Sequence, residues 1–468
     1  MRRGSGGGSG KYVPLRYQTH TDMITKTFSL RRLLLCATLG LTAFAPTSRL
    51  AAQEGPGGRP EPPQFIEPTY IERPSWMRYE QKADEPIENV QARVARFAGQ
   101  TFDIDTLRWS GPGAIDIVVM GDGYTAAEQA KFTADARRCT DHLFETTPFD
   151  RYKDFFNIFA LHVVSEESGI SHPGQWKETD GVGEMVCPEG KTLPIVRKRT
   201  FFGAHLDGWG VHRITGAWNS QSAKDLVRMY FPRCKFPCIL CNTDEYGGAG
   251  GEILMATCNS AASEIYVHEL AHVFGDLADE YFGGDVYMGE KPNLSSVRDS
   301  ARVRWHRWIG EAEVGVFPHR GGRKGAYYVK PTQASDTSRY CKMERLGKEF
   351  CPVCRERLVE AIHEQADLIA AASPADSVLA PLAKRERVTF SLDHVRRVTG
   401  DKQTVRWFVD GTLAAEDTEA LTLDAKRLPA ESAHEVRLEV YDESPFVRNP
   451  TCPRYHTSVR TWRIARRR

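Results

Sequence analysis

Residues 263–281 read SEIYVHELAHVFGDLADEY, and this stretch decides how the surrounding chain must fold. It contains the pattern His-Glu-x-x-His, in which His268 and His272 stand four residues apart. Residues at this spacing lie on one face of an α-helix, so two imidazoles can bind one metal ion together. Glu269 follows the first histidine, where its carboxylate is expected to face a water molecule beside the metal.

The remaining side chains of this stretch are mostly apolar, which predicts a buried helix rather than a surface helix with unrelated charges. Two histidines and a glutamate in a buried helix need partners. We therefore predict a Zn2+ site on His268 and His272 with Glu269 as general base. Zinc lowers the pKa of a bound water from about 15.7 to near 7, and a glutamate beside it can accept the proton as peptide hydrolysis begins.

A zinc site of this kind needs a third protein ligand and an open fourth position. Gly275 stands three residues after His272, where a helix can end and the chain can turn back. Asp279 or Glu280 would then return toward the metal, and Asp279 is the predicted third ligand. The alternative is that Asp279 only orients a ligand histidine without touching the metal.

Length and composition describe an ordinary globular protein. The chain has 468 residues, 41% hydrophobic and 26% charged, which fits two or three domains. The formal net charge is +1, so no global charge favours nucleic acid or acidic lipid as a partner. A protein or peptide substrate is the expected partner, and the oligomeric state stays open.

The first 52 residues resemble an extension followed by an export signal. Arg31 and Arg32 precede an uncharged apolar run, 33–45, and small residues follow at 48–52, near an expected cleavage point. The run is too short for a stable membrane span, so none is expected after signal removal. The alternative is a buried core helix. We predict a protein that reaches the periplasm, the cell surface or the medium.

Eleven cysteines fit an exported chain. Removal of Cys36 with the signal leaves ten, an even number for which disulfides are the expected state. Cys341 is a natural partner for Cys351 or Cys354. The alternative, a structural zinc site or a redox pair, is suggested by the spacing within two groups: Cys351 with Cys354, and Cys234 with Cys238 and Cys241.

Five segments divide the chain. After residues 1–52, a linker rich in proline spans 53–85, a short β segment 86–112, and the metallopeptidase domain 113–372. That domain opens with a buried strand at 115–120, a capping box at Thr125 and Glu128, and helical spacing through Leu143. Further strands are expected at 159–164 and 237–241. This alternation predicts a mixed α/β (α+β) sheet.

Residues 382–468 have a different hydrophobic pattern from the preceding domain. Short alternating runs recur around Phe390, Trp407, Leu421, Leu438 and Trp462, and a hairpin-type turn stands at 410–411. Five or more strands at such spacing predict an all-β sandwich domain.

The chain resembles the IgA-peptidase-like family of bacterial zinc metallopeptidases, a metzincin-like group. The resemblance rests on IDIVVMGDGYT (115–125), the Phe-Phe-Asn core of 149–163, SEESG (165–169), NTDEYGGAGG (242–251), HELAHVFGDLADEY (268–281) and CKMERLGKEFCPVCRE (341–356). It implies a metzincin-like fold, with a mixed sheet over an active-site helix. It also implies that His268 and His272 bind zinc, that Glu269 is catalytic and that Met343 is the Met-turn methionine.

One feature departs from the common metzincin spacing. That spacing puts the third ligand six residues after the second histidine, at Ala278, which has no ligand atom in its side chain. Asp279 lies one residue further on, so the departure bears on the third ligand and not on the histidine pair.

A run of glycines precedes the 252–257 segment. In metzincin-like enzymes an edge strand at this place pairs with an extended substrate, and glycines would let the two backbones come close. The residues predicted for substrate binding are Gly247, Gly248, Gly250 and Gly251. A flexible loop is the alternative, whereas a phosphate loop is excluded because no Lys-Ser/Thr follows.

The sequence thus predicts an exported zinc metalloendopeptidase with a β-sandwich accessory domain. Two alternatives stay open: a catalytically inactive peptidase-like binding or adhesion protein, and a zinc hydrolase of a non-peptide amide. The intact His-Glu-x-x-His pattern speaks against the inactive scaffold.

Overall fold

The structure is a computed structural model that describes residues 102–173, 196–208, 212–280, 290–318, 328–329, 341–429, 432–449 and 457–467. The predicted signal segment 1–52 and the linker 53–85 lie outside these described residues.

A six-stranded mixed sheet carries the site, in the order β1-β3-β2-β6-β8-β7. Strands β3, β2, β6 and β8 run parallel, while the outer strands β1 and β7 are antiparallel to their neighbours. The strands are β1 (Ile104–Arg108), β2 (Ile115–Asp122), β3 (Phe156–Leu161), β6 (Pro237–Cys241), β7 (Gly248–Gly250) and β8 (Leu254–Thr257). The predicted mixed sheet and its strands at β2 and β6 are confirmed, and β1, from the 86–112 segment, pairs within this same sheet.

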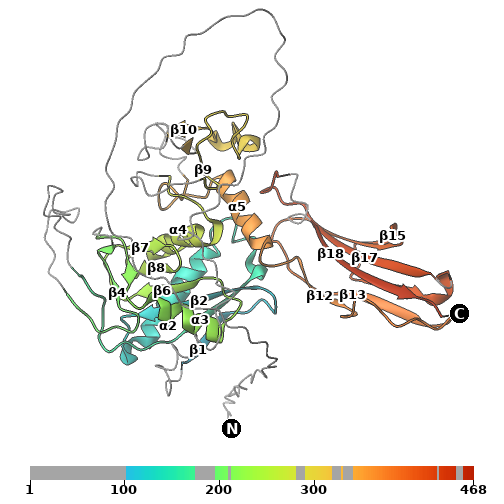
Figure 1. The fold of residues 1–468 in the computed structure, drawn as a ribbon, viewed down its shortest axis with the longest axis horizontal. Helices are drawn as coiled ribbons and strands as arrows, with labels where there is room; N and C mark the ends of the chain where they lie inside the picture. The colour runs from blue at the N-terminus through green and yellow to red at the C-terminus, as the bar shows by residue number, and fades with distance from the viewer. Residues whose placement is uncertain are drawn as a thin grey trace, which may run out of the picture. The chain divides into compact units, whose positions relative to one another are not determined.

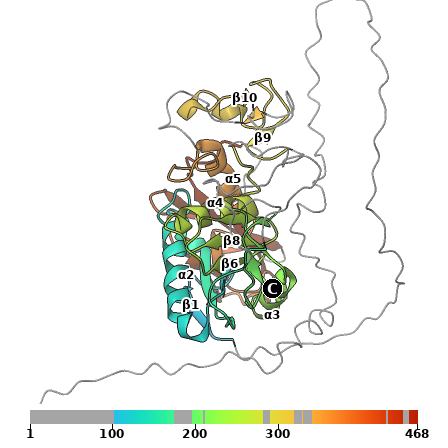
Figure 2. The same cartoon turned by 90° about the vertical axis from the view of Figure 1, so that its left-hand side faces the viewer.

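Helices cover both faces of this sheet. Figure 2 shows α2 and α3 on opposite sides of the β6 and β8 strands. Alternating residues of β2 explain this arrangement, because Ile117 and Val119 join the core under α2, while Val118 and Met120 join the core under α3. The helices are α2 (Gln129–Leu143), α3 (Ser220–Tyr230), α4 (Ala262–Gly275) and α5 (Pro352–His363). Helix α4 packs beside β7 and β8 (Figure 1).

The capping box is confirmed where the chain leaves β2. The amide of Thr125 donates to the carboxylate of Glu128 (2.9 Å), and a 3₁₀ turn at Ala126–Glu128 leads into α2. Just before it, the buried carboxylate of Asp122 accepts hydrogen bonds from the amides of Phe202 (2.9 Å) and Ala204 (2.7 Å). Asp122 therefore anchors the 200–204 segment at the carboxyl end of the sheet.

Two antiparallel sheets follow α5, in the orders β12-β13-β16 and β15-β14-β17-β18 (Figure 1). Phe390 and Trp462 bring them into contact, with ring centroids 5.1 Å apart. Asp410 and Gly411 have φ of 51° and 79° and form the predicted turn between β14 and β15. The strands are β12 (Ile369–Ser373), β13 (Arg387–Val395), β14 (Gln403–Val409), β15 (Thr412–Glu416), β16 (Ala420–Asp424), β17 (Ala433–Asp442) and β18 (Thr457–Ala465).

Short strands complete the described chain. They are β4 (Ala204–His205), β5 (Gly216–Ala217), β9 (Leu294–Ser295), β10 (Phe317–Pro318) and β11 (Tyr328–Val329). Strands β4 and β5 pair with each other, and β9, β10 and β11 form a small sheet of their own.

Candidate active site

Helix α4 carries the His-Glu-x-x-His pattern. Its apolar side chains, Ile265, Val267, Leu270 and Ala271 among them, are buried in the main core, as the sequence predicts. The helix ends at Gly275, because Asp276 adopts the left-handed conformation with φ of 56° and its amide returns to the carbonyl of His272. The predicted turn after Gly275 is confirmed, and it sends Asp279 back toward the histidines.

Backbone carbonyls orient both imidazoles. Nδ1 of His268 donates to the carbonyl of Lys342 (3.0 Å), and Nδ1 of His272 donates to the carbonyl of Leu277 (2.7 Å). A carbonyl oxygen can only accept, so the proton of each neutral ring resides on Nδ1 and the lone pair on Nε2. The two Nε2 atoms lie 3.2 Å apart and face a common point.

Asp279 completes a group of three potential metal ligands. Its Oδ1 lies 3.0 Å from Nε2 of His268 and 3.2 Å from Nε2 of His272. Nitrogen and oxygen donors at about 2.0–2.1 Å from a tetrahedral zinc ion would be about 3.3–3.4 Å apart. The donor types and their separations therefore fit a zinc ion. Glu280, the other predicted alternative, instead joins a group of cysteines, with Oε1 3.7 Å from Sγ of Cys354.

Charges in this group are strongly coupled. Burial disfavours the charged imidazolium, but the carboxylates of Asp279 and Glu269 outweigh it and raise the pKa of His272 to about 9. Burial likewise opposes the charge on Asp279, yet the two histidines hold the pKa of that carboxyl well below its usual range. The carboxylates that stabilise a positively charged imidazole here would also stabilise a bound divalent cation.

Glu269 lies beside the metal-ligand group. Its Oε2 is 3.9 Å from Nε2 of His272, close to the three donors without being one of them. Burial raises the pKa of Glu269, and the neighbouring histidines offset part of that rise. A raised pKa makes a carboxylate a stronger base, which suits proton transfer near neutral pH.

A cavity of about 430 Å³ opens over this group. His268, Glu269 and Gly248 line it together with Arg213 and Tyr246, which the sequence interpretation did not single out; the other lining residues are Ile265, Glu344, Arg345 and Leu346. Tyr246 belongs to the quoted NTDEYGGAGG segment, so its motif was a signal for it. Arg213 carries no motif and reaches the cavity only through the fold.

The glycine run has a steric role against α4. A Cβ atom at Gly248 would lie 2.4 Å from Ile265 Cγ2, and one at Gly250 would lie 2.8 Å from both Glu269 Oε2 and His272 Cβ. At Gly251 nothing lies within 4 Å. Gly247, whose Cβ would meet Leu206 at 2.8 Å, faces away from these two contacts. Glycine at 248 and 250 thus lets the edge strand β7 lie directly on the helix that carries Glu269.

Part of the outer edge of β7 already forms backbone hydrogen bonds within the chain. The amide of Gly248 donates to the carbonyl of Arg213 (3.0 Å), and the carbonyl of Gly248 accepts from the amide of Thr215 (3.4 Å). An added strand would therefore meet this edge beyond Gly248, toward Gly250.

Met343 is fully buried, and its carbonyl accepts a hydrogen bond from the amide of Glu280 (2.8 Å). The preceding residue, Lys342, supplies the carbonyl that orients His268. The turn at 341–344 thus contacts His268, and also Glu280, the residue that follows Asp279.

The structure has no disulfide among the eight described cysteines, all of which are buried, so the predicted disulfides are not shown there. Sγ of Cys341 and Sγ of Cys354 are 3.7 Å apart, far beyond a sulfur–sulfur bond of about 2.05 Å. Evenness of the count is a weak argument, because pairing depends on geometry that the count does not contain. Cys187 and Cys452 lie outside the described residues.

A further potential metal-binding group lies elsewhere in the described chain. Nε2 of His172 is 2.9 Å from Oε1 of Glu245, and Nε2 of His212 is 3.1 Å from Oε2 of the same carboxylate. The rings of His172 and His212 stack, so one carboxylate bridges both. Glu245 belongs to the quoted NTDEYGGAGG segment, whereas no sequence motif marked His172 or His212.

Within the described parts of the chain, no helix combines the length and the apolar character that crossing a membrane requires. A comparison with curated proteins gave no match to the chain. The family model described as IgA Peptidase M64 matches residues 106–320, a range that contains β2, the glycine run and all of α4. The resemblance drawn from the sequence motifs is thereby confirmed over residues 106–320, which match this family of peptidases.

Proposed function

We propose that the protein is an exported, zinc-dependent endopeptidase. One observation carries the proposal: Nε2 of His268, Nε2 of His272 and Oδ1 of Asp279 lie within 3.2 Å of one another, beside a cavity that His268 and Glu269 line. His268, His272 and Asp279 would hold the metal. When bound, zinc supplies a Lewis acid for the substrate carbonyl and makes water more acidic.

The side chains around the cavity have distinct parts in this proposal. Glu269 accepts the proton of the attacking water and then donates it to the leaving amine. Arg213 and Tyr246 lie where they can stabilise negative charge on the carbonyl oxygen. Extended substrate adds to the edge of β7 beyond Gly248, held by backbone hydrogen bonds.

The same proposal covers the finer fold assignment. A mixed sheet whose outer strand β7 runs antiparallel above an active-site helix supports a metzincin-like domain, with Met343 as its Met-turn residue. The ring contact between Phe390 and Trp462 supports reading the two C-terminal sheets as a β-sandwich accessory domain. The basic and apolar pattern of residues 31–45 supports export.

The test compares the unmodified protein with Glu269→Gln on an unfolded protein substrate. We expect the variant to keep its zinc, because Glu269 is not a ligand, and to lose about 10²–10⁴-fold in kcat. Glu166→Gln, an exposed position, is the matched control and should keep full activity. A chelator should abolish cleavage, and added zinc should restore it.

The outcomes separate the alternatives. Full activity of Glu269→Gln would overturn the mechanism. Zinc binding without cleavage of any peptide would favour an inactive scaffold, and hydrolysis confined to small non-peptide amides would favour the other zinc hydrolase. Export is tested separately by sequencing the amino terminus of the mature protein, which is expected near residue 53.

A further inference from the structure

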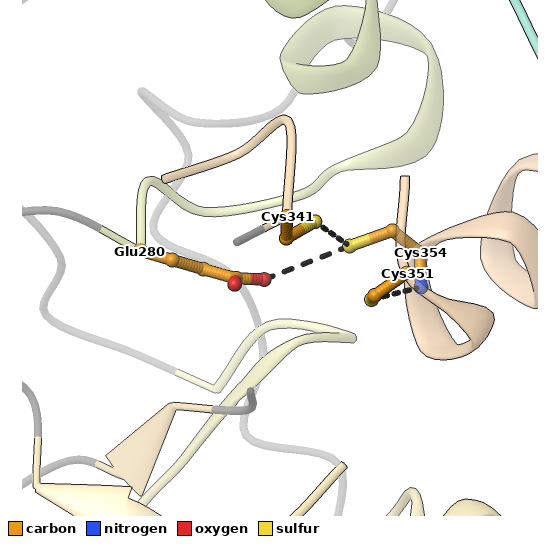
Figure 3. A group of neighbouring side chains, drawn as sticks. All are labelled: Glu280, Cys341, Cys351 and Cys354. Carbon is orange, nitrogen blue, oxygen red and sulfur yellow. Dashed lines mark hydrogen bonds between the residues drawn. The ribbon is translucent and has the colours of Figure 1, made fainter. Parts of the chain in front are cut away.

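A second group of metal-ligand side chains lies next to the candidate active site. It consists of Glu280, Cys341, Cys351 and Cys354, all buried, whose ligand atoms lie within 4.8 Å of one another. Figure 3 shows the four side chains pointing toward one another from three separate chain segments. Glu280 follows α4, Cys341 begins the turn at 341–344, and Cys351 and Cys354 belong to the start of α5.

We infer that these four residues form a closed, structural zinc site. Three soft thiolates and one carboxylate oxygen are zinc ligands, and four protein ligands with no access for substrate are typical of structural rather than catalytic zinc. The site lies outside the catalytic group His268, His272 and Asp279, and it does not depend on the proposed peptidase activity.

Two distances within the group match a tetrahedron around zinc. With Zn–S of about 2.3 Å and Zn–O of about 2.1 Å, two sulfurs would be about 3.8 Å apart, and a sulfur and an oxygen about 3.6 Å apart. Sγ of Cys341 lies 3.7 Å from Sγ of Cys354, and Sγ of Cys354 lies 3.7 Å from Oε1 of Glu280. Both separations agree with the tetrahedral values.

The start of α5 favours thiolate at this place. Cys351 is the N-cap residue of α5, Pro352 follows it, and Sγ of Cys351 accepts a hydrogen bond from the amide of Cys354 (3.4 Å). Thiolates are stabilised at helix N-termini by exposed amides and by the helix dipole. Each cysteine releases its proton when it binds the metal.

A buried amide holds the carboxylate in place. Nδ2 of Asn293 donates to Oε1 of Glu280 (2.9 Å), and the same side chain bonds both the amide and the carbonyl of Ala278 (2.8 Å each). Partners of this kind fix the orientation of metal ligands. Asn293 therefore fixes the backbone of the 278–280 segment, which carries both Asp279 and Glu280.

This site would brace the catalytic centre. Its ligands Glu280 and Cys341 are sequence neighbours of Asp279 and of Lys342, whose carbonyl orients His268. The amide of Glu280 also donates to the carbonyl of Met343. Zinc at the cysteines would therefore pin the third catalytic ligand and the turn at 341–344 to the start of α5.

The experiment measures zinc per chain and the zinc ligands in the full-length protein, purified with a thiol reductant. We expect two zinc ions per unmodified chain and an X-ray absorption spectrum with sulfur at about 2.3 Å, averaging about 1.5 sulfurs per zinc. His268→Ala/His272→Ala should retain one zinc with three sulfurs. Cys351→Ser/Cys354→Ser should lose that zinc, and Cys139→Ser, a buried thiol in α2, should keep both.

The results that overturn the inference are equally definite. A single zinc with no sulfur ligand in the unmodified protein rules the cysteine site out, whether or not any variant folds. A disulfide among Cys341, Cys351 and Cys354, found by thiol labelling and mass spectrometry of the reductant-free protein, also rules it out. An unmodified chain that holds the sulfur-bound zinc but no zinc at the histidines would instead count against the proposed function.

Discussion

At the scale of single residues, Asp279 lies beside the two histidines even though its position in the sequence differs from the common spacing. Its carboxylate lies within 3.2 Å of both Nε2 atoms, although it stands one residue beyond the common metzincin spacing. The left-handed Asp276 and the hydrogen bonds of Asn293 guide the backbone there. The common spacing puts the third residue six positions after the second histidine, and this chain brings Asp279 back to the histidines after seven.

Replacement of Asp279 distinguishes a metal ligand from a residue that only orients one. We expect Asp279→Ala to weaken zinc binding at the histidines by more than about 100-fold, whereas removal of an orienting residue typically costs about 10–100-fold. Competition with a chromogenic chelator measures the affinity. Asp141→Ala, on the exposed face of α2, serves as the control, and affinity within tenfold of the unmodified protein would contradict the ligand assignment.

Tyr246 is expected to act on the transition state. Partial burial raises the pKa of Tyr246, and the charges of Glu269 and Asp279 add to the rise while Arg213 opposes it, so the hydroxyl stays a hydrogen-bond donor at neutral pH. Loss of one such donor to an oxyanion costs about 10²–10³-fold in kcat, and we expect Tyr246→Phe to fall in this range with little change in KM. Steady-state kinetics on a peptide checks this, and a change confined to KM would assign Tyr246 to substrate binding alone.

At the scale of elements, β7 packs against α4 and beside Glu269. The strand lies so close that side chains at 248 and 250 have no room. The nearest atom at 248 is Ile265 Cγ2, and at 250 the nearest atoms are those of Glu269 and His272. Flexibility is therefore not the reason for these two glycines. Their small size lets an edge strand and an active-site helix share one wall of the cavity.

Gly250→Ala and Gly251→Ala form a matched pair for this contact. The new Cβ at 250 would lie 2.8 Å from Glu269 Oε2 and 3.0 Å from the Glu269 carbonyl, whereas at 251 it meets nothing within 4 Å. We expect Gly250→Ala to lose about 1–3 kcal/mol of stability and most of its kcat, since overpacking forces the two elements apart. Denaturant unfolding and kinetics measure both quantities, and equal behaviour of the two variants would contradict the steric role.

At the scale of the whole described molecule, the C-terminal strands and the peptidase part share partly buried polar contacts. Arg396, on the segment after β13, donates through Nη2 to the carbonyl of Pro112 (2.7 Å) and through Nη1 to that of Ser110 (3.2 Å). Arg151 pairs with Asp401 at 2.7 Å. These contacts connect residues that are about 250 or more positions apart in the sequence.

Asp442 makes the stability of this region depend on pH. Burial, together with the charge of Asp401, raises the pKa of Asp442 to about 7. The unfolded chain releases this proton near pH 4 and the folded chain only near pH 7, so the contribution to stability falls as pH rises between these values. Above pH 7 the loss is constant, on the order of a few kcal/mol.

Asp442→Asn should therefore be more stable than the unmodified protein at pH 8 and show little difference at pH 4. Denaturant unfolding at several pH values gives the difference, whose slope should be about 1.4 kcal/mol per pH unit between the two pKa values. Asp376→Asn, at an exposed position, is the control. A difference that is the same at pH 4 and pH 8 would contradict the assignment to Asp442.

The sequence by itself determined the local features of this protein: the buried strands β2 and β6, the capping box before α2, the helix that carries His268, Glu269 and His272, its end at Gly275, and the turn at Asp410 and Gly411. Each depends on neighbours within a few residues, so periodicity and turn chemistry predict it. Tertiary structure decided which distant residues meet: Asp279 with the histidines, Glu280 with three cysteines, and Arg213 with the cavity. Such meetings depend on the packing of elements far apart in the chain, and the spacing of residues along the sequence does not contain that information.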